Sequence, residues 1–334
     1  MVRRHLAALA VAIPLLGVTP EPLQQQLHDT AARYYARLSG IAPLAGPQTT
    51  FDYYQRLNDD AAALAQNDDD DATRRAATLD LSLVDQLLDR NFQPMGAIRG
   101  LGETFVRSSR DGTMQPVAVY VPPSYSPQHP VPLLVLLHGR PQPETWLMAP
   151  PFMAQLADAN GTIVVAPWGG GFYDFRGTAS DVYDALHAAL GAFNIDPRKK
   201  YLGGYSMGGF SVFEVAPQHP DEWSAVMSIA GSLLGSDASR AVAMLRNTPI
   251  YVLTGTDDQS IPTQWPTATA GYLALAGLNV SFYSQKGGTH HLASLLPVLT
   301  QAWSDMLHQI VRAPNTNLAR MSLPGTIPMN PMKP

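Results

Sequence analysis

The second half of the chain alternates short apolar runs with stretches of helical character. Val131–Leu137 is apolar at every position, which is typical of a strand buried on both faces of a sheet. Strands that alternate with helices form a mostly parallel sheet with helices on both sides. The predicted strands are 131–137, 162–166, 200–205, 225–229, 250–254 and 280–283, and the predicted helices are 150–159, 178–193, 207–217, 236–246, 266–277 and 291–312.

Two further strands are expected before this region. Residues 105–109 and 117–121 have the composition of strands, and Asp111-Gly112 between them is a hairpin turn signal. An antiparallel hairpin therefore opens the sheet, which brings the expected total to eight strands. We expect one α/β domain over residues 100–312, with a mostly parallel eight-stranded sheet flanked by helices.

Residues 21–99 are expected to form a helical extension ahead of that domain. Leu23, Leu27, Ala31 and Tyr34 recur at three- and four-residue spacing, the mark of one apolar helix face. Two more helices are expected near 51–66 and 70–91. The extension is compatible with a lid over the site, a support packed on the domain or a dimer contact, and the sequence leaves the oligomeric state open.

The two ends of the chain have a different character. Residues 1–20 combine a basic start with an apolar run, Leu6–Val18, as in a secretory signal, although an apolar helix packed on the domain is the alternative. This pattern favours a secreted or periplasmic location over a cytoplasmic one. The run is too short to span a bilayer, so no stable membrane insertion is expected. Residues 313–334 are rich in proline and are expected to be extended or disordered.

Composition excludes several kinds of chemistry. The 334 residues include no cysteine, which removes disulfides, thiolate nucleophiles and thiolate metal sites. The formal net charge of -5, without a long basic stretch, argues against nucleic acid as a partner. Asp68-Asp69-Asp70-Asp71 suits the start of a helix, where the helix dipole favours negative charge, better than a metal site.

The strongest functional motif is Gly204-Tyr205-Ser206-Met207-Gly208, at the junction of a predicted strand and a predicted helix. A serine hydroxyl is a weak nucleophile and must be held exposed beside a base. A sharp strand-to-helix turn achieves this and needs small neighbours on both sides of the serine. We therefore predict that Ser206 is a catalytic nucleophile.

Candidate partners follow the serine in the order acid, then histidine. Asp257 and Asp258 both come after the strand 250–254, at the edge of the sheet where a carboxylate can orient an imidazole. His290 and His291 follow the strand 280–283, and His290 is preferred as the base because it fits a Gly-x-His pattern. A metal site at the paired histidines is disfavoured, because adjacent side chains rarely converge on one ion and no third ligand is evident.

Two backbone N–H groups are expected to hold the oxyanion of a tetrahedral intermediate. One belongs to Met207, directly after the nucleophile, and the other to Arg140, after the strand 131–137. His138 precedes the serine, which is the wrong order for a catalytic base in this arrangement, so we expect it to brace the loop.

The segment Asn194–Gly209 resembles the I-D-P-x-R-x-Y-L-x-G-x-S-M-G-G block of bacterial esterases. That group includes feruloyl and acetyl xylan esterases, polyhydroxybutyrate depolymerase-like esterases and prolyl-oligopeptidase-type hydrolases. The segment Asp111–Gly139 is similar to their opening hairpin, and the likeness covers roughly residues 100–312. It implies an α/β-hydrolase fold and ester hydrolysis through an acyl-enzyme without a cofactor. The recurrent G-x-x-D-x-x-(V/I)-P loop of these enzymes favours Asp258 as the acid.

The resemblance leaves the substrate open. A small-molecule or polymer-linked ester is expected, and an oligopeptidase or a non-catalytic binding protein on the same scaffold are the rival interpretations. Aromatic residues after strand ends are candidate substrate contacts, although aromatic residues more often cover the core. They are Trp168, Phe172, Tyr173, Trp146 and Trp265. An aromatic wall would suit feruloyl-type or polyester substrates.

Overall fold

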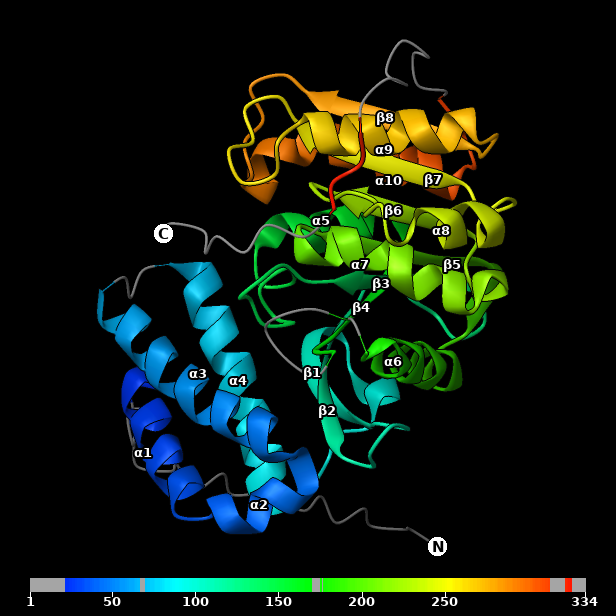
Figure 1. Cartoon of the computed structure of the whole chain (residues 1–334). Coiled ribbons are helices and arrows are strands. Elements are labelled where there is room, and N and C mark those ends of the chain that lie inside the picture. Colours follow the sequence, from blue (N-terminus) through cyan, green and yellow to red (C-terminus); the bar gives the residue numbers. More distant parts are fainter. Residues whose placement is uncertain (1–21, 67–69, 170–174, 176, 313–321, 326–334) are drawn as a thin grey trace, which may run out of the picture.

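The computed structural model describes residues 22–66, 70–169, 175, 177–312 and 322–325. Its centre is one eight-stranded sheet with the strand order β1-β2-β4-β3-β5-β6-β7-β8 (Figure 1). β2 pairs antiparallel with β1 and with β4, and all other neighbours are parallel. The strands are β1 (Gly100–Arg107), β2 (Met114–Val121), β3 (Val131–Leu137), β4 (Ile163–Pro167), β5 (Ile195–Tyr205), β6 (Ala225–Ile229), β7 (Ile250–Gly255) and β8 (Val280–Gln285).

Alternate residues of each strand face two separate cores, because successive side chains of a strand point to opposite faces of the sheet. One face is covered by α6 (Ala179–Ala192), α7 (Met207–Val215), α8 (Ala238–Met244) and α9 (Gln264–Leu275). The other is covered by α5 (Pro151–Asn160) and α10 (Leu296–Leu307). The predicted eight-stranded, mostly parallel sheet flanked by helices is confirmed.

Among the residues described, four α-helices precede the sheet, where the sequence pattern predicted three. They are α1 (Leu23–Tyr35), α2 (Leu38–Ala45), α3 (Pro47–Gln66) and α4 (Asp71–Asp89). The turn between α1 and α2 redirects the chain, so that Tyr34 and Ile41 enter the same core from different helices. Asp70 caps α4 by accepting a hydrogen bond from the Thr73 N–H at 2.9 Å, which fits an acidic residue at a helix start.

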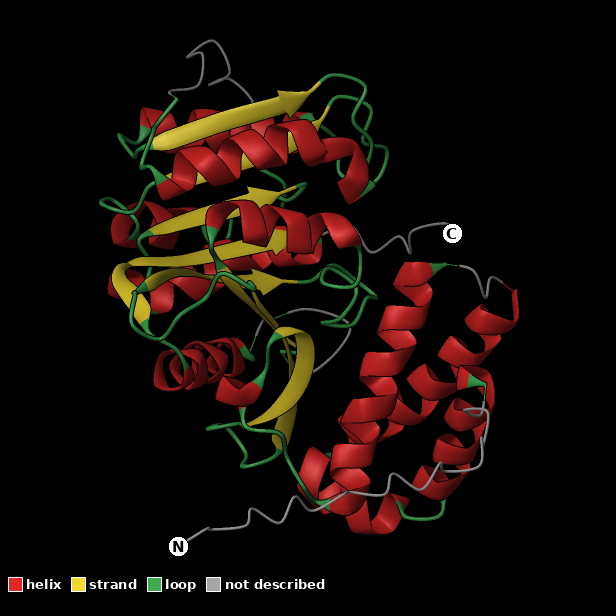
Figure 2. Cartoon of the chain, turned by 180° about the vertical axis from the view of Figure 1, so that it is seen from behind, coloured by secondary structure: helices red, strands yellow, loops and turns green. Residues whose placement is uncertain are grey.

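These four helices form a bundle, called the N-terminal bundle below, beside the β1–β2 edge of the sheet (Figure 2). Phe105 of β1 and Met114 of β2 belong to the same buried cluster as the bundle residues Tyr53 and Leu83. The bundle therefore shares its core with the hairpin instead of standing apart from the sheet.

Some predictions concern residues outside the described ones. They are the signal-like segment 1–20, Asp68-Asp69, and the tail residues 313–321 and 326–334. Of the tail, Leu323 packs on the core beside the sheet, and the Pro324 carbonyl accepts a hydrogen bond from the Gly235 N–H at 3.0 Å. Within the part of the chain that the structure describes, no helix is long and apolar enough to cross a bilayer.

Candidate active site

Ser206 sits at a sharp turn between β5 and α7. Its φ of 54° and ψ of -115° place it in a region that residues with a side chain rarely adopt. The turn is held to the neighbouring strand β6 by a hydrogen bond from the Ser206 N–H to the Ile229 carbonyl at 2.8 Å. A Cβ atom on Gly204 would lie 2.2 Å from the Gly208 carbonyl oxygen, and one on Gly208 would lie 2.3 Å from the Leu137 carbonyl oxygen. Only glycine fits at these two positions, as the motif requires.

His290 and Asp258 reach Ser206 from the loops after β8 and β7. The Ser206 Oγ and the His290 Nε2 are 2.9 Å apart, and the His290 Nδ1 and the Asp258 Oδ2 are 2.8 Å apart. The three side chains are nearly buried. Asp257 and His291 are exposed and lie outside this chain of hydrogen bonds. Of the two doubled pairs in the sequence, the structure brings Asp258 and His290 to the serine.

The Asp258 carboxylate is fixed from its other side. Its Oδ1 accepts hydrogen bonds from the backbone N–H groups of Ser260 and Ile261, each at 2.8 Å. The Oδ2 thus remains for the imidazole, and an imidazole bonded through Nδ1–H presents Nε2 to the serine as an acceptor. This geometry suits transfer of the serine proton to His290.

Tyr205 supports the histidine and was not singled out in the sequence. Its hydroxyl donates a hydrogen bond to the His290 carbonyl oxygen, and its ring lies 5.3 Å from the imidazole. Trp146 stacks on the Tyr205 ring, with ring centroids 5.5 Å apart. Tyr205 is the variable residue just before the serine in the motif, so its place in the motif was a signal that could have found it.

One predicted oxyanion donor, Met207, follows the serine directly in the chain, and the other, Arg140, lies in a loop tied to the serine turn. Met207 is the first residue of α7, where the N–H groups of the first turn have no partner within the helix. Arg140 belongs to the loop 138–150 between β3 and α5, called the β3–α5 loop below. This loop is tied to the serine turn because the Gly208 N–H donates to the His138 carbonyl at 3.0 Å.

His138 braces the β3–α5 loop, as expected. It is fully buried, its Nδ1 lies 2.8 Å from the Gly139 carbonyl oxygen, and its Nε2 lies 3.2 Å from the Trp168 carbonyl oxygen. Burial lowers its pKa. With both nitrogens engaged by backbone oxygens, His138 is not positioned to act as a base for Ser206.

The candidate aromatic contacts have different environments. Trp168 is only 1% exposed and stacks on His138, so its position does not support the prediction that it touches substrate. Trp265 is half-buried beside Phe210, and Trp146 is half-buried on Tyr205, which leaves both with accessible surface near the serine turn. Phe172 and Tyr173 lie outside the described residues.

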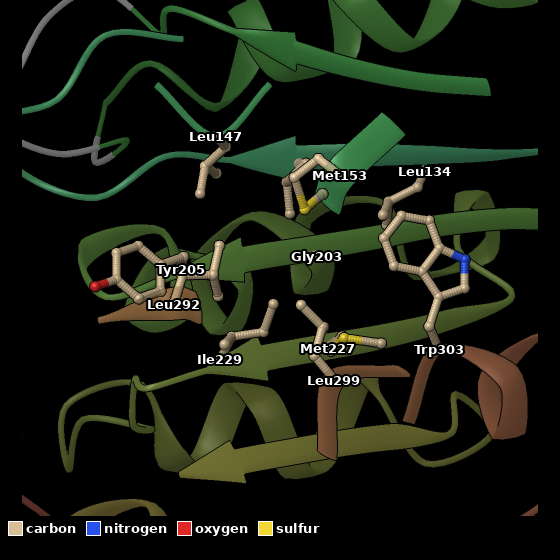
Figure 3. A pocket seen from close by; sticks show the side chains of 11 residues that line it. Leu134, Leu147, Met153, Gly203, Tyr205, Met227, Ile229, Leu292, Leu299 and Trp303 are labelled. Carbon is tan, nitrogen blue, oxygen red and sulfur yellow. The ribbon is translucent and has the colours of Figure 1, made fainter. Parts of the chain in front are cut away.

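A small cavity lies beside Tyr205, between the sheet and α10 (Figure 3). Its lining is apolar and runs from Tyr205 at one end to Trp303 at the other. Its volume of about 10 Å³ holds about one water-sized sphere, far less than a substrate needs. The cavity is a packing defect in the core and not a substrate site.

A second buried polar cluster was not predicted from the sequence. It consists of Arg56, Asp60, Asp80, Glu103 and Glu144, called the Arg56 cluster below. The Arg56 guanidinium bonds Asp80 through Nε and Nη2, and Glu144 through Nη1 at 3.0 Å. Burial raises the pKa of Glu103 well above its usual range, and burial together with Asp80 raises the pKa of Asp60 to about 9.

Among the residues described, no three or more His, Asp or Glu side chains are arranged so that they could hold a metal ion, the carboxyl groups around Arg56 included. The polar groups that converge on Ser206 are instead those of nucleophilic catalysis: a hydroxyl, an imidazole and a carboxylate in series.

The sheet, its strand order and the turn at its centre define an α/β-hydrolase. A family model described as "Putative esterase" matches residues 108–294, and the chain belongs to this esterase family. The matched segment begins after the N-terminal bundle and includes Ser206, Asp258 and His290.

The chain is similar in sequence to one esterase and in structure to others. A bifunctional acetylxylan esterase/xylanase of Neocallimastix patriciarum is 29% identical over 162 residues, which are 46% of this chain and 23% of that protein. A ferulic acid esterase structure is 17% identical over 62% of this chain and 98% of its own, with a TM-score of 0.53. A ferulic acid esterase from Anaeromyces mucronatus is 15% identical over 63% and 90%, with a TM-score of 0.52. At these identities, the two structures show the shared fold.

Proposed function

We propose that this chain is a serine carboxylic-ester hydrolase that works through an acyl-enzyme. The observation that carries the proposal is the series of two hydrogen bonds from Ser206 through His290 to Asp258, at 2.9 Å and 2.8 Å. Membership of the esterase family supports it.

In the proposed mechanism, Ser206 Oγ attacks the ester carbonyl carbon while His290 Nε2 takes the serine proton. Asp258 holds the imidazole in the tautomer that accepts this proton and stabilises the imidazolium that results. The N–H groups of Met207 and Arg140 hold the oxyanion, and each such donor is worth about 3 kcal/mol of transition-state stabilisation. His290 returns the proton to the departing alcohol, and the reverse sequence with water then releases the acid and frees Ser206.

The proposed substrates are small-molecule or polymer-linked esters, including aromatic, feruloyl-type or polyester ones. The names of the similar proteins, an acetylxylan esterase and two ferulic acid esterases, support this class. The half-buried rings of Trp146 and Trp265 near the serine turn offer an apolar wall for an aromatic acyl group. We assign the chemistry to residues 100–312.

The test combines labelling with a substrate panel. A fluorophosphonate probe should label Ser206 in the full chain, and Ser206→Ala should abolish both labelling and hydrolysis. The panel compares p-nitrophenyl acetate, methyl ferulate and a soluble polyester oligomer with peptide anilides. Faster anilide cleavage would replace the esterase by an oligopeptidase. Absence of both labelling and hydrolysis would support a non-catalytic scaffold, and undiminished hydrolysis in Ser206→Ala would show that Ser206 is not the nucleophile.

We also propose a secreted or periplasmic location. The basic Arg3-Arg4-His5 and the apolar run Leu6–Val18 support export. Fractionation of producing cells, followed by N-terminal sequencing of the purified protein, tests this. Recovery from the cytoplasm with an intact Met1 would contradict it.

A further inference from the structure

Arg56 of α3 is buried although it carries a charge, at 5% exposure. Its Nε donates to the Asp80 Oδ2 at 3.1 Å, and its Nη2 donates to the other oxygen of the same carboxylate. Its Nη1 donates to the Glu144 Oε1 at 3.0 Å. The planar guanidinium offers several donors in a fixed geometry, so it can bind two carboxylates at once. One side chain thus joins α3 and α4 of the bundle to the β3–α5 loop.

The β3–α5 loop depends on such external contacts for its shape. It contains no helix or strand, and Glu144 and Thr145 within it are fully buried. A second contact from the bundle holds its far end, because the Arg75 Nε donates to the Ala149 carbonyl at 3.1 Å. The same loop carries Arg140, a proposed oxyanion donor. The bundle therefore fixes the loop that must place that donor.

Arg56 also reaches the serine turn by a second route. Its guanidinium carbon lies 5.6 Å from the ring centroid of Trp168, and the Trp168 ring stacks on His138 at 5.6 Å. The His138 carbonyl accepts the Gly208 N–H two residues after the nucleophile. A continuous set of packed groups therefore connects Arg56 with both sides of the oxyanion position.

We propose that Arg56 is a positioning residue of the esterase site, and that through Glu144 the N-terminal bundle holds the β3–α5 loop where its N–H group can stabilise the oxyanion. The inference rests on the proposed function above. It selects a support among the three roles that the sequence allowed for residues 21–99. Because misplacement of a reacting group by about 1 Å costs roughly a hundredfold in rate, loss of Arg56 should lower kcat by about 10- to 100-fold. KM should stay within about threefold, since the ground-state carbonyl depends little on the oxyanion donors.

The experiment compares Arg56→Met with two control variants in the full chain. Leu57→Ala removes a fully buried neighbour on α3 and destabilises the bundle without touching Glu144. Arg33→Met removes an exposed ion pair with Asp85 on the same bundle. Titration with a fluorophosphonate counts the active sites, so that kcat refers to folded enzyme. The inhibition constant of a trifluoromethyl ketone, which forms a tetrahedral oxyanion on the serine, is measured beside kcat and KM.

The expected result is a fall in kcat and a parallel rise in the trifluoromethyl ketone inhibition constant for Arg56→Met. Both controls should keep kcat per titrated site. An unchanged kcat in Arg56→Met, or a loss confined to KM, would overturn the inference. Equal losses in Leu57→Ala would also overturn it, because they would reflect general loosening of the bundle.

Glu144→Gln tests the same link with a smaller change and guards against failure of Arg56→Met to fold. The amide still accepts one hydrogen bond but has no charge, so kcat should fall about 3- to 10-fold with KM unchanged. In the double variant Arg56→Met/Glu144→Gln, a kcat equal to that of Arg56→Met would show that Arg56 acts through Glu144. Losses that multiply would show that the two residues act independently. If the wild-type chain neither labels with fluorophosphonate nor hydrolyses esters, the proposed function fails. If the wild-type chain labels and hydrolyses esters, and Arg56→Met and Glu144→Gln have the same kcat as the wild type, only the positioning role of Arg56 fails.

Discussion

The buried polar groups around Ser206 and those around Arg56 differ in how their charges are balanced. Around Ser206 the side chains form one series, in which Ser206 bonds His290, His290 bonds Asp258, and Asp258 uses both carboxylate oxygens. The chain of hydrogen bonds ends in two backbone N–H groups, so it needs no second cation. This cluster is compact and is formed by loops that follow strand ends.

The Arg56 cluster contains one cation and four carboxyl groups. Burial raises the pKa of Asp60 and of Glu103, and the neighbouring carboxylates of Asp80 and Glu144 raise them further, so that these two groups favour the protonated form. Although burial opposes it, the Arg56 guanidinium holds the pKa of Glu144 below its usual value. The Arg56 cluster therefore holds protons in the folded state, and its contribution to the free energy of unfolding should depend on pH. At the Ser206 site, substitutions should instead change the catalytic rate.

The largest expected effect concerns the two adjacent histidines. His290→Ala should lower kcat/KM about ten-thousandfold or more, because the serine loses its base. His291→Ala changes an exposed side chain and should leave kcat/KM within about threefold. Ester hydrolysis by purified variants, normalised by protein mass and circular dichroism, measures both. A larger loss in His291→Ala than in His290→Ala would reverse the assignment.

Substitutions of the two adjacent aspartates should also differ in their effect on activity. Asp258→Asn removes the charge that stabilises the imidazolium and should lower kcat by about a thousand- to ten-thousandfold. Asp257, which is exposed and bonded to the Thr256 hydroxyl, should tolerate Asn with little change. Steady-state kinetics of the pair decide, and equal losses would show that the loop, not one carboxylate, carries the effect.

The sequence predicted the sheet because strand periodicity and helix spacing are local properties of the chain. It also predicted the serine turn, since Gly204 and Gly208 flank the serine at a fixed spacing. It left Asp257 and Asp258 open without the family resemblance, because adjacent residues point in different directions that only the loop conformation sets. The roles of Ser206, Asp258, His290, Met207 and Arg140 stay predictions until the variants are assayed.

The Arg56 cluster could not be predicted, because its members come from α3, α4, β1 and the β3–α5 loop. A weak signal was present: Arg56 follows Tyr53 by three residues and therefore lies on the apolar face of α3. A charged residue on such a face needs a buried partner, but the sequence does not say which. The burial of Trp168 could not be predicted for the same reason, since its ring is contacted by Arg56 from the distant α3.

The third prediction concerns the stability of the Arg56 cluster. Arg56→Met leaves Asp80 and Glu144 without their cation and should lower the free energy of unfolding by about 3–5 kcal/mol. Arg33→Met removes a solvent-exposed ion pair and should cost no more than about 1 kcal/mol. Urea denaturation followed by circular dichroism measures both. Similar losses would show that burial does not distinguish the two pairs.

The fourth prediction is the pH dependence of that stability. Asp60 has a folded pKa of about 9, raised by burial, by Asp80 and by Asp59, with Arg56 opposing. Because an unfolded aspartate titrates near about 3.9, the folded state holds an extra proton between these values and loses stability as the pH rises. Asp60→Asn removes this titrating group. The fall of the free energy of unfolding between pH 5 and 8 should therefore become less steep by up to about 1.4 kcal/mol per pH unit. Urea midpoints of both proteins at several pH values measure it, and parallel curves would contradict the raised pKa.

The smallest expected effect tests the core beneath the Ser206 site. A Cβ on Gly203 would lie 3.2 Å from the ends of Leu134 and Leu136, and all three residues line the cavity of Figure 3. The leucine side chains can shift into this space, and alanine in a strand loses less backbone entropy than glycine. Gly203→Ala should therefore raise the free energy of unfolding by about 0.5–1 kcal/mol and keep kcat. Gly204→Ala is the matched control, because its Cβ would meet the rigid Gly208 carbonyl at 2.2 Å and should abolish activity. If both substitutions were equally harmful, the strand below the serine would be as tightly constrained as the turn itself.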